Sequence, residues 1–210
     1  MDENKLNIIK PFGPAIAKVK MPEKIINALN DHVDKIVNNE ELSKKFDNGK
    51  YLAGNVKQEL SLSKEISEES GWSSFLANST RAWIKFCLGK NIKEFQIYSS
   101  WIVRQFSNEY NPVHWHTGHI SGAGFLKVPS TFGETFQKDK KNLNGKLVLI
   151  HGSKSFLCNS KYEIIPEVGD FYIFPHYLMH TVYPFKDTND ERRSISFNAK
   201  VDDKIFDVFF

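Results

Sequence analysis

The histidines of this chain are concentrated in one stretch. All of them except His32 lie between residues 114 and 180. The tightest group is His114-Trp115-His116, at the end of an Asn-Pro-Val-His-Trp-His motif. Residues two apart in a strand point to the same face, so the two imidazoles would project together, about 6 to 7 Å apart along the backbone. This spacing suits two ligands of one metal ion, although the pair alone fits a surface strand equally well.

A third imidazole could reach the same ion from a distant part of the chain. His180 precedes Thr-Val-Tyr-Pro, a turn that leads back into a strand, and a jelly roll brings distant strands side by side. His119 follows His116 at a helical spacing, so we expect it outside the pocket. His151 and His176 have no partner in sequence, and we expect surface or supporting roles for them.

A candidate anion site follows in the segment Glu-Arg-Arg-Ser-Ile-Ser-Phe-Asn, which alternates as a strand does. Arg193, Ile195 and Phe197 would share one face, which has two apolar residues for a core. Arg192 and Ser194 would lie on the opposite, wholly polar face. Exposure to solvent would be the simplest explanation of such a face. Inside a barrel, however, the guanidinium fork and a hydroxyl two residues on would match a carboxylate.

Together these residues resemble the Fe(II)- and 2-oxoglutarate-dependent oxygenases. That superfamily has a double-stranded β-helix, a His-x-Asp/Glu motif, a distal His, and an Arg or Lys soon after it. The counterparts in this sequence are His114, His116, His180, Arg192 and Ser194. The runs Asn-Pro-x-His-x-His, Lys-Val-Pro, Gly-Asp-x-x-x-Phe-Pro and Arg-x-Ser-x-x-Phe-Asn are similar to a subfamily from marine bacteria and their phages. The likeness covers residues 94–200 well and the N-terminal half loosely.

The resemblance implies a 2-oxoglutarate-dependent dioxygenase. His114, His116 and His180 would hold Fe(II), while Arg192, helped by Ser194, would bind the far carboxylate of 2-oxoglutarate. With O2 as the other cosubstrate, the enzyme would hydroxylate a peptidyl, nucleotide or small-metabolite substrate and release succinate and CO2.

One departure from the superfamily concerns charge. His116 stands where the superfamily usually has a carboxylate, so three neutral histidines would leave the iron more electron-poor. The strand phase makes a separate prediction. Arg192→Ala should abolish 2-oxoglutarate turnover, whereas Arg193→Ala should spare most of it.

Two other kinds of protein share parts of this pattern. Three histidines around an open position also describe a zinc or iron enzyme that does not use 2-oxoglutarate. Such an enzyme has no need of a carboxylate clamp at Arg192. A jelly-roll binding module with incidental histidines is the non-enzymatic alternative.

The elements that would position these residues change in type near residue 90. Before it, Pro22 begins a helical pattern, and a second pattern runs from Ser70 to Leu88, ending at Gly89. The segment from Val56 to Leu62 could be a short strand. Five later segments read as strands: Glu94–Phe106, Ile120–Val128, Lys146–Ile150, Phe171–Phe174 and Arg192–Val201. These patterns predict an α+β, mainly β fold, in which N-terminal helices pack on one sheet of a jelly roll.

Length, composition and charge limit the domain organisation, partners and location that we expect. Its 210 residues fit a single domain, 1–210, with a mostly helical part (1–90) and a jelly-roll core (91–210). The formal net charge is +3 and no block of one sign occurs, which argues against a nucleic-acid partner without excluding one. We find no secretory signal or apolar span, and the two cysteines have no metal or redox spacing. We therefore expect no membrane partner, and a location in the cytoplasm of a bacterium or a phage-infected host.

Overall fold

The computed structural model describes residues 7–9, 13–51, 53–135, 137 and 139–207. The helices are α1 (Glu23–Val37), α2 (Glu40–Phe46), α3 (Lys64–Glu69), α4 (Trp72–Leu88) and α5 (Asp203–Phe206), with a 3-10 turn at Gly49–Tyr51. The strands are β1 (Asn7–Ile9), β2 (Ile16–Lys20), β3 (Gln58–Ser61), β4 (Phe95–Gln105), β5 (Asn111–His114), β6 (Ile120–Lys127), β7 (Leu147–Ile150), β8 (Lys161–Ile164), β9 (Asp170–Pro175), β10 (Met179–Val182) and β11 (Arg192–Val201).

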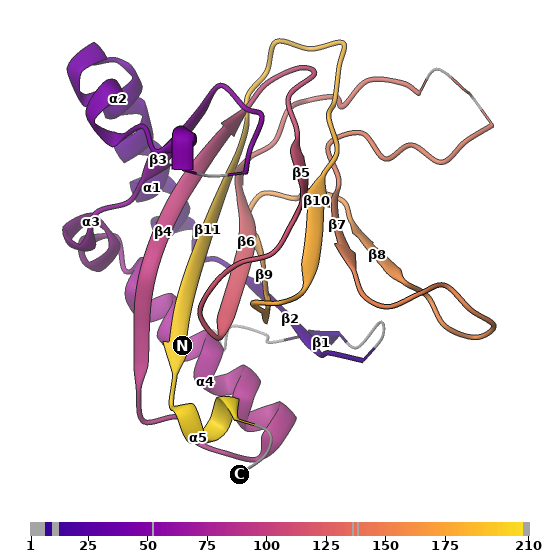
Figure 1. Ribbon diagram of the computed structural model, residues 1–210. Helices are drawn as coiled ribbons and strands as arrows, with labels where there is room; N and C mark the ends of the chain where they lie inside the picture. Colours follow the sequence, from indigo (N-terminus) through magenta and orange to yellow (C-terminus); the bar gives the residue numbers. More distant parts are fainter. Residues whose placement is uncertain (1–6, 10–12, 52, 136, 138, 208–210) are drawn as a thin grey trace.

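The strands form two antiparallel sheets that face each other (Figure 1). The large sheet has the order β1-β2-β9-β6-β11-β4-β3, and the small sheet has the order β5-β10-β7-β8. The longest pairing joins β11 to β4 over their whole lengths. The side chains of the central strand β11 that point toward the small sheet are therefore enclosed between the two sheets.

Helices α1 and α4 cover the outer face of the large sheet (Figure 1). The helical pattern that begins at Pro22 forms α1, and its apolar residues, which recur on one face, are buried from Ile25 through Leu29 and Val33 to Ile36. Fully burying an aliphatic side chain of this size contributes roughly 1.5–3 kcal/mol. Helix α4 ends where Gly89 adopts a left-handed conformation, with φ 68°, as its C-terminal glycine predicts.

A second apolar cluster fills part of the space between the two sheets. It joins Phe125 of β6 and Phe174 of β9 to Leu147 and Leu149 of β7. On β11 the predicted alternation holds, because Ile195 and Phe197 face the helical layer and pack in the other core. The opposite face of β11 is thereby turned into the space beside this second cluster.

The predicted fold class is confirmed: the chain is mainly β, with N-terminal helices packed on one sheet. All five strands predicted after residue 90 are present, with no end shifted by more than one residue, and the short strand between Val56 and Leu62 is β3. One helical detail is wrong. The Ser70–Leu88 pattern would place Phe86 on the buried face with Trp83, but Phe86 is 69% exposed, and the partly buried Cys87 packs on the core instead. That the chain is a single domain stays a prediction.

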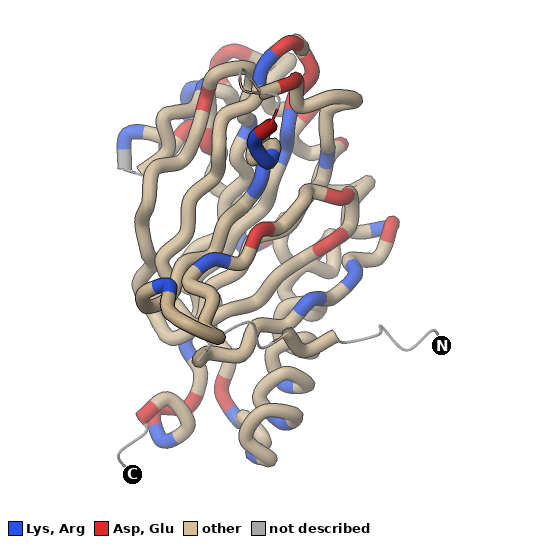
Figure 2. Tube along the Cα trace, turned by 90° about the vertical axis from the view of Figure 1, so that its right-hand side faces the viewer, with Lys and Arg blue, Asp and Glu red and all other residues tan. Residues whose placement is uncertain are grey.

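The charges of the surface are mixed. In the view of Figure 2, segments that carry Lys or Arg lie among segments that carry Asp or Glu. Among the described residues, no helix has both the length and the apolar character needed to cross a bilayer.

Candidate metal centre

The predicted histidines reach the space between the sheets from three places. His114 ends β5, and His180 lies directly opposite it on the neighbouring strand β10. His116 lies beyond the end of β5, where its backbone N–H donates to the carbonyl of His176 at 3.0 Å. Two expectations need correction: the strand does not continue through His116, and Thr181 and Val182, expected in a turn after His180, belong with it to strand β10.

The three imidazoles face one another. Their ring centroids lie 4.3 Å apart for His114 and His180, 4.8 Å for His116 and His180, and 5.0 Å for His114 and His116. Nε2 of His116 lies 3.0 Å from Nε2 of His180. One ring nitrogen from each histidine lies within 4.8 Å of the other two. The three rings can therefore offer nitrogen ligands to a single ion.

Hydrogen bonds at the outer ring nitrogens fix the orientation of two of these rings. Nδ1–H of His114 donates to the carbonyl of Pro112 at 2.7 Å, and Nδ1–H of His180 donates to the carbonyl of Leu178 at 2.9 Å. In a neutral imidazole, Nε2 then carries the lone pair and points into the cluster.

Burial keeps the cluster neutral. Together with the neighbouring rings of His180 and His114, burial lowers the pKa of His116 to about 2. Burial and the ring of His114 lower the pKa of His180 to about 3. Neutral imidazoles are the form that binds a metal, and three such ligands suit iron, zinc or copper.

Arg192 lies in the same pocket, on the inward face of β11, and is 1% exposed. Its Nη1–H groups donate to Oε1 of Gln105 at 3.1 Å and to Oγ of Ser194 at 3.3 Å. Its Nε–H has no partner, and no carboxylate among the described residues forms an ion pair with it. Burial lowers the pKa of Arg192 to about 9, so the guanidinium remains charged at neutral pH. A buried cation without a counter-charge is costly, which points to an anionic ligand.

Gln105 holds the guanidinium of Arg192 in place by accepting its hydrogen bond. Its side-chain amide donates to the carbonyl of Glu109 at 2.6 Å, and it lies opposite Arg192 in the pairing of β4 with β11. Sequence reasoning missed Gln105. The alternation of β4 could have found it, because Trp101, Val103 and Gln105 share one face of that strand.

Arg193 points the other way, toward the helical layer. Its guanidinium binds Glu191 at 2.8 Å and Asp34 of α1 at 2.7 Å. It is thus fully paired and remote from the histidine pocket, as the strand phase predicts for the two arginines. The pocket is lined by every predicted site residue, His114, His116, His180, Arg192 and Ser194, together with Trp101 and Asn111 among others.

The other histidines lie outside this cluster. His119 stacks on Phe206 of α5, with ring centroids 3.9 Å apart. His176 contacts the same phenyl ring at 5.6 Å. Trp115 alternates with the two histidines, so its indole is expected on the other face of the strand, in packing; it is instead 65% exposed. No helix that the structure describes covers the outer face of the small sheet (Figure 1).

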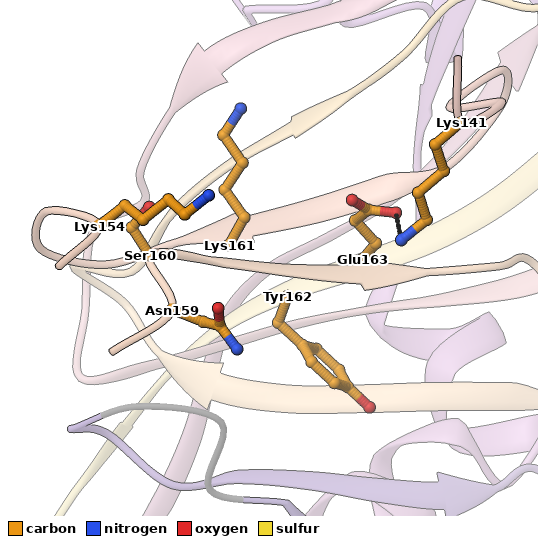
Figure 3. A pocket seen from close by; sticks show the side chains of 7 residues that line it. All are labelled: Lys141, Lys154, Asn159, Ser160, Lys161, Tyr162 and Glu163. Atoms are coloured by element: carbon orange, nitrogen blue, oxygen red, sulfur yellow. Dashed lines mark ion pairs between the residues drawn. The ribbon is translucent and has the colours of Figure 1, made fainter. Parts of the chain in front are cut away.

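A separate hollow lies on the outer face of β8. Lys161 and Glu163 rise from one side of this strand and Tyr162 from the other (Figure 3). The carboxylate of Glu163 is paired with Lys141 at 2.7 Å and with Lys146 at 3.2 Å. The hollow shares no residue with the histidine pocket, and its lysines are those of an ordinary solvated surface.

Comparison with known proteins bears on this site. Residues 99–198, which contain the whole cluster and the arginine, match a family model described as "Putative 2OG-Fe(II) oxygenase". The chain resembles the 2OG-Fe(II) oxygenases. This confirms the likeness predicted from the sequence, and the family implies the predicted set of Fe(II), 2-oxoglutarate and O2. No curated protein matches the chain.

Solved structures share the fold at low sequence identity. A prolyl-4-hydroxylase from Pseudomonas putida aligns with a TM-score of 0.54 at 14% identity, over 87% of this chain and 91% of that one. A prolyl hydroxylase from Trichoplax adhaerens, in complex with a hypoxia inducible factor peptide fragment, aligns with a TM-score of 0.56 at 15% identity, over 97% and 86%. The 2-oxoglutarate complex of a viral collagen prolyl hydroxylase from Paramecium Bursaria Chlorella virus-1 gives 0.52 at 14% identity, over 88% and 94%. These likenesses show the double-stranded β-helix fold.

The residues of the pocket fit the cofactors that the family implies. Converging neutral nitrogens suit a divalent metal ion, and an unpaired guanidinium suits a carboxylate. The cluster itself contains histidines and no carboxylate, so the described ligand set differs from the usual one of the superfamily at His116.

Proposed function

We propose that this protein is an Fe(II)- and 2-oxoglutarate-dependent dioxygenase that hydroxylates a peptide or a small molecule. One observation carries the proposal: the unpaired, buried guanidinium of Arg192 shares a pocket with three converging neutral histidines. A zinc hydrolase or a simple binding module explains the histidines but gives no reason for this buried charge.

In this proposal His114, His116 and His180 hold the metal. A bound Fe(II) would supply the redox chemistry by which O2 oxidises 2-oxoglutarate to succinate and CO2 and leaves one oxygen atom on the substrate. The imidazoles of His116 and His180 take no part as acids, because burial keeps the pKa of each far below neutral pH.

Arg192 and Ser194 would bind the far carboxylate of 2-oxoglutarate. The guanidinium is held by Gln105 and lies 5.1 Å from the ring centroid of Phe125. Because water is excluded there, a charge-assisted hydrogen bond is stronger than at the surface. Trp101, whose ring centroid lies 5.3 Å from that of His116, would keep water from the metal side of the pocket.

The substrate class follows only by analogy. One structural neighbour binds a peptide fragment, and another is an epimerase from nogalamycin biosynthesis, so both peptides and small molecules are compatible with this fold. We also place the protein in the cytoplasm of a bacterium or a phage-infected host, where the thiols of Cys87 and Cys158 would stay reduced.

The test is anaerobic titration of the Fe(II)-loaded protein with 2-oxoglutarate, followed by visible absorption. The wild type should develop a charge-transfer band and, once O2 is admitted, form succinate. Arg192→Met keeps the side-chain volume but removes the charge, and should weaken 2-oxoglutarate binding by about 100-fold, because it removes one partner of a buried charge pair. Tight zinc retention with no band in the wild type would overturn the proposal in favour of a hydrolase or lyase.

A further inference from the structure

A buried carboxyl lies behind the histidine pocket, and the chemistry proposed above does not use it. Glu59 is on β3, the edge strand of the large sheet, and is 1% exposed. It pairs with Val103 of β4, which lines the pocket. The Glu59 side chain therefore points to the inner side of the sheet, whereas Leu60 points to the helical core.

This carboxyl contacts one pocket residue. The side chain of Asn111 hydrogen-bonds to it, and Asn111 lines the pocket together with the three histidines and Arg192. Glu59 and Asn111 thus join the edge strand of the large sheet to β5, the edge strand of the small sheet. Close by, Asn55 and Tyr110 pair through their backbones at 2.9 and 3.2 Å.

The chain leaves room for this contact at Gly54. A Cβ added there would lie 2.6 Å from Oε1 of Glu59 and 3.0 Å from Nδ2 of Asn111. A side chain at residue 54 would therefore enter the contact itself.

Packing alone does not account for a glutamate at this position. Its Oε2 is buried and has no partner, and no cation among the described residues pairs with it. Burial, with a small contribution from Asp47, raises the pKa of Glu59 to about 7, against the opposing effect of Asn111. A leucine would fill a similar volume without burying a polar atom.

We propose that Glu59 is a positioning residue, which fixes the amide of Asn111 at the wall of the histidine pocket, and that Asn111 contacts the 2-oxoglutarate bound there. The inference rests on the proposed function and adds two residues to it. Asn111 is the polar side chain that β5 contributes to the pocket besides its histidine. An amide held on one side by a carboxyl presents its remaining hydrogen-bonding groups in a fixed direction.

The experiment measures the Kd of 2-oxoglutarate from the charge-transfer band of the anaerobic Fe(II) protein, and the Kd of Co(II) in a separate titration. Glu59→Leu should raise the Kd of 2-oxoglutarate about tenfold, the usual effect of one lost hydrogen bond. The Kd of Co(II) should change less than about twofold, since the histidines are untouched. Glu59→Gln keeps a neutral hydrogen-bonding group of the same size and should bind 2-oxoglutarate as the wild type does.

Two glycine variants address the same contact without altering the carboxyl. Gly54→Ala should reproduce the effect of Glu59→Leu, because the methyl group displaces the carboxyl from Asn111. Gly49→Ala is the matched control: its Cβ would meet only Asp47, at 3.3 Å, and 2-oxoglutarate binding should not change.

The outcomes separate the two proposals. No band in the wild type overturns the proposed function, and this inference with it. A normal band together with wild-type affinity in Glu59→Leu and Gly54→Ala overturns the inference alone. Equal losses of 2-oxoglutarate and Co(II) affinity, or failure of Glu59→Gln to restore binding, would show that Glu59 supports only the fold, and would also overturn it.

Discussion

At Arg192, stability and ligand binding place opposite demands on one side chain. The guanidinium is buried with two neutral partners and no counter-ion. An unpaired buried charge destabilises the folded state, and proteins accept such a cost mainly at functional sites. The ligand-free protein should therefore be less stable with this arginine than with an uncharged residue of similar shape.

Arg192→Met should raise the free energy of unfolding of the ligand-free protein by about 1–3 kcal/mol, because it removes the uncompensated charge. The same variant should lose the stabilisation that 2-oxoglutarate gives to the Fe(II)-loaded wild type. Urea denaturation with and without 2-oxoglutarate measures both effects. A destabilised ligand-free variant would mean that the charge is compensated by a group that we have not identified.

Glu59 gives the molecule a pH dependence with a definite sign. Its pKa is about 7 in the folded protein, against an ordinary value of 4.5. An acid whose pKa is raised on folding stabilises the folded state fully below its unfolded pKa, and this stabilisation is lost as the pH rises through the folded pKa. The loss should develop between about pH 4.5 and 7 and amount to about 3 kcal/mol.

Comparing Glu59→Gln with the wild type isolates this effect. The unfolding free energy of the variant, minus that of the wild type, should increase from pH 5 to pH 7 and level off above it. Urea denaturation of the metal-free proteins at four pH values measures the difference. A difference that does not change with pH would mean that Glu59 is ionised in the folded state.

At the scale of elements, one ion-pair network holds helix α1 on strand β11 beside the pocket. Glu191 receives two hydrogen bonds from Arg104 of β4, at 2.9 and 3.2 Å, and two from Arg193, at 2.8 and 3.1 Å. Burial alone would raise the pKa of Glu191, but the hydrogen bonds from Arg193 and Arg104 hold it below its ordinary value. The Glu191 carboxylate therefore stays charged, and its hydrogen bonds hold Arg193, the neighbour of Arg192, in place.

Two acids of this network should differ strongly in their effect on stability. Glu191→Leu leaves two guanidinium groups without their shared partner, one of them buried, and should cost about 3–5 kcal/mol. Asp34→Asn removes a partner that is 59% exposed, and should cost less than about 1 kcal/mol. Thermal unfolding of the two variants tests this, and equal losses would contradict the role given to Glu191.

Local patterns predict some elements of this fold and not others. The alternation of β11 placed Arg192 inward and Arg193 outward, because one buried face specifies the phase of a strand. Strand β2 was missed: its partner β9 pairs Ala17 with Ile173, and no local pattern reports so distant a neighbour. His116 was predicted to be in a strand, but it lies beyond the end of β5, where a backbone hydrogen bond to His176 holds it. Glu59 was missed for the same reason as β2, since its role comes from Asn111 on another strand, whereas the alternation of β4 was enough to place Gln105 on the inward face.

At the scale of the whole molecule, the candidate metal centre connects parts of the chain that the fold alone joins weakly. The small sheet has short strands, and β5 and β10 share only two paired positions, with an irregularity between them. The three ligands come from these two strands and from the loop that follows β5. An ion bound there would tie the edge of the small sheet together, whereas the helical layer and the large sheet have their own core.

Metal binding should therefore stabilise the molecule unevenly. A metal that binds only the folded state at 100 times its Kd adds about 2.7 kcal/mol, which for a chain of this length raises the Tm by roughly 5 to 10 °C. Hydrogen exchange with and without Co(II) should show new protection in β5 and β10 and little change in α1 and α4. His180→Gln should abolish both effects, whereas His151→Gln, outside the cluster, should leave them intact. Protection spread evenly over helices and sheets would mean that the ion binds elsewhere, because only a ligand held between β5 and β10 confines its effect to the edge of the small sheet.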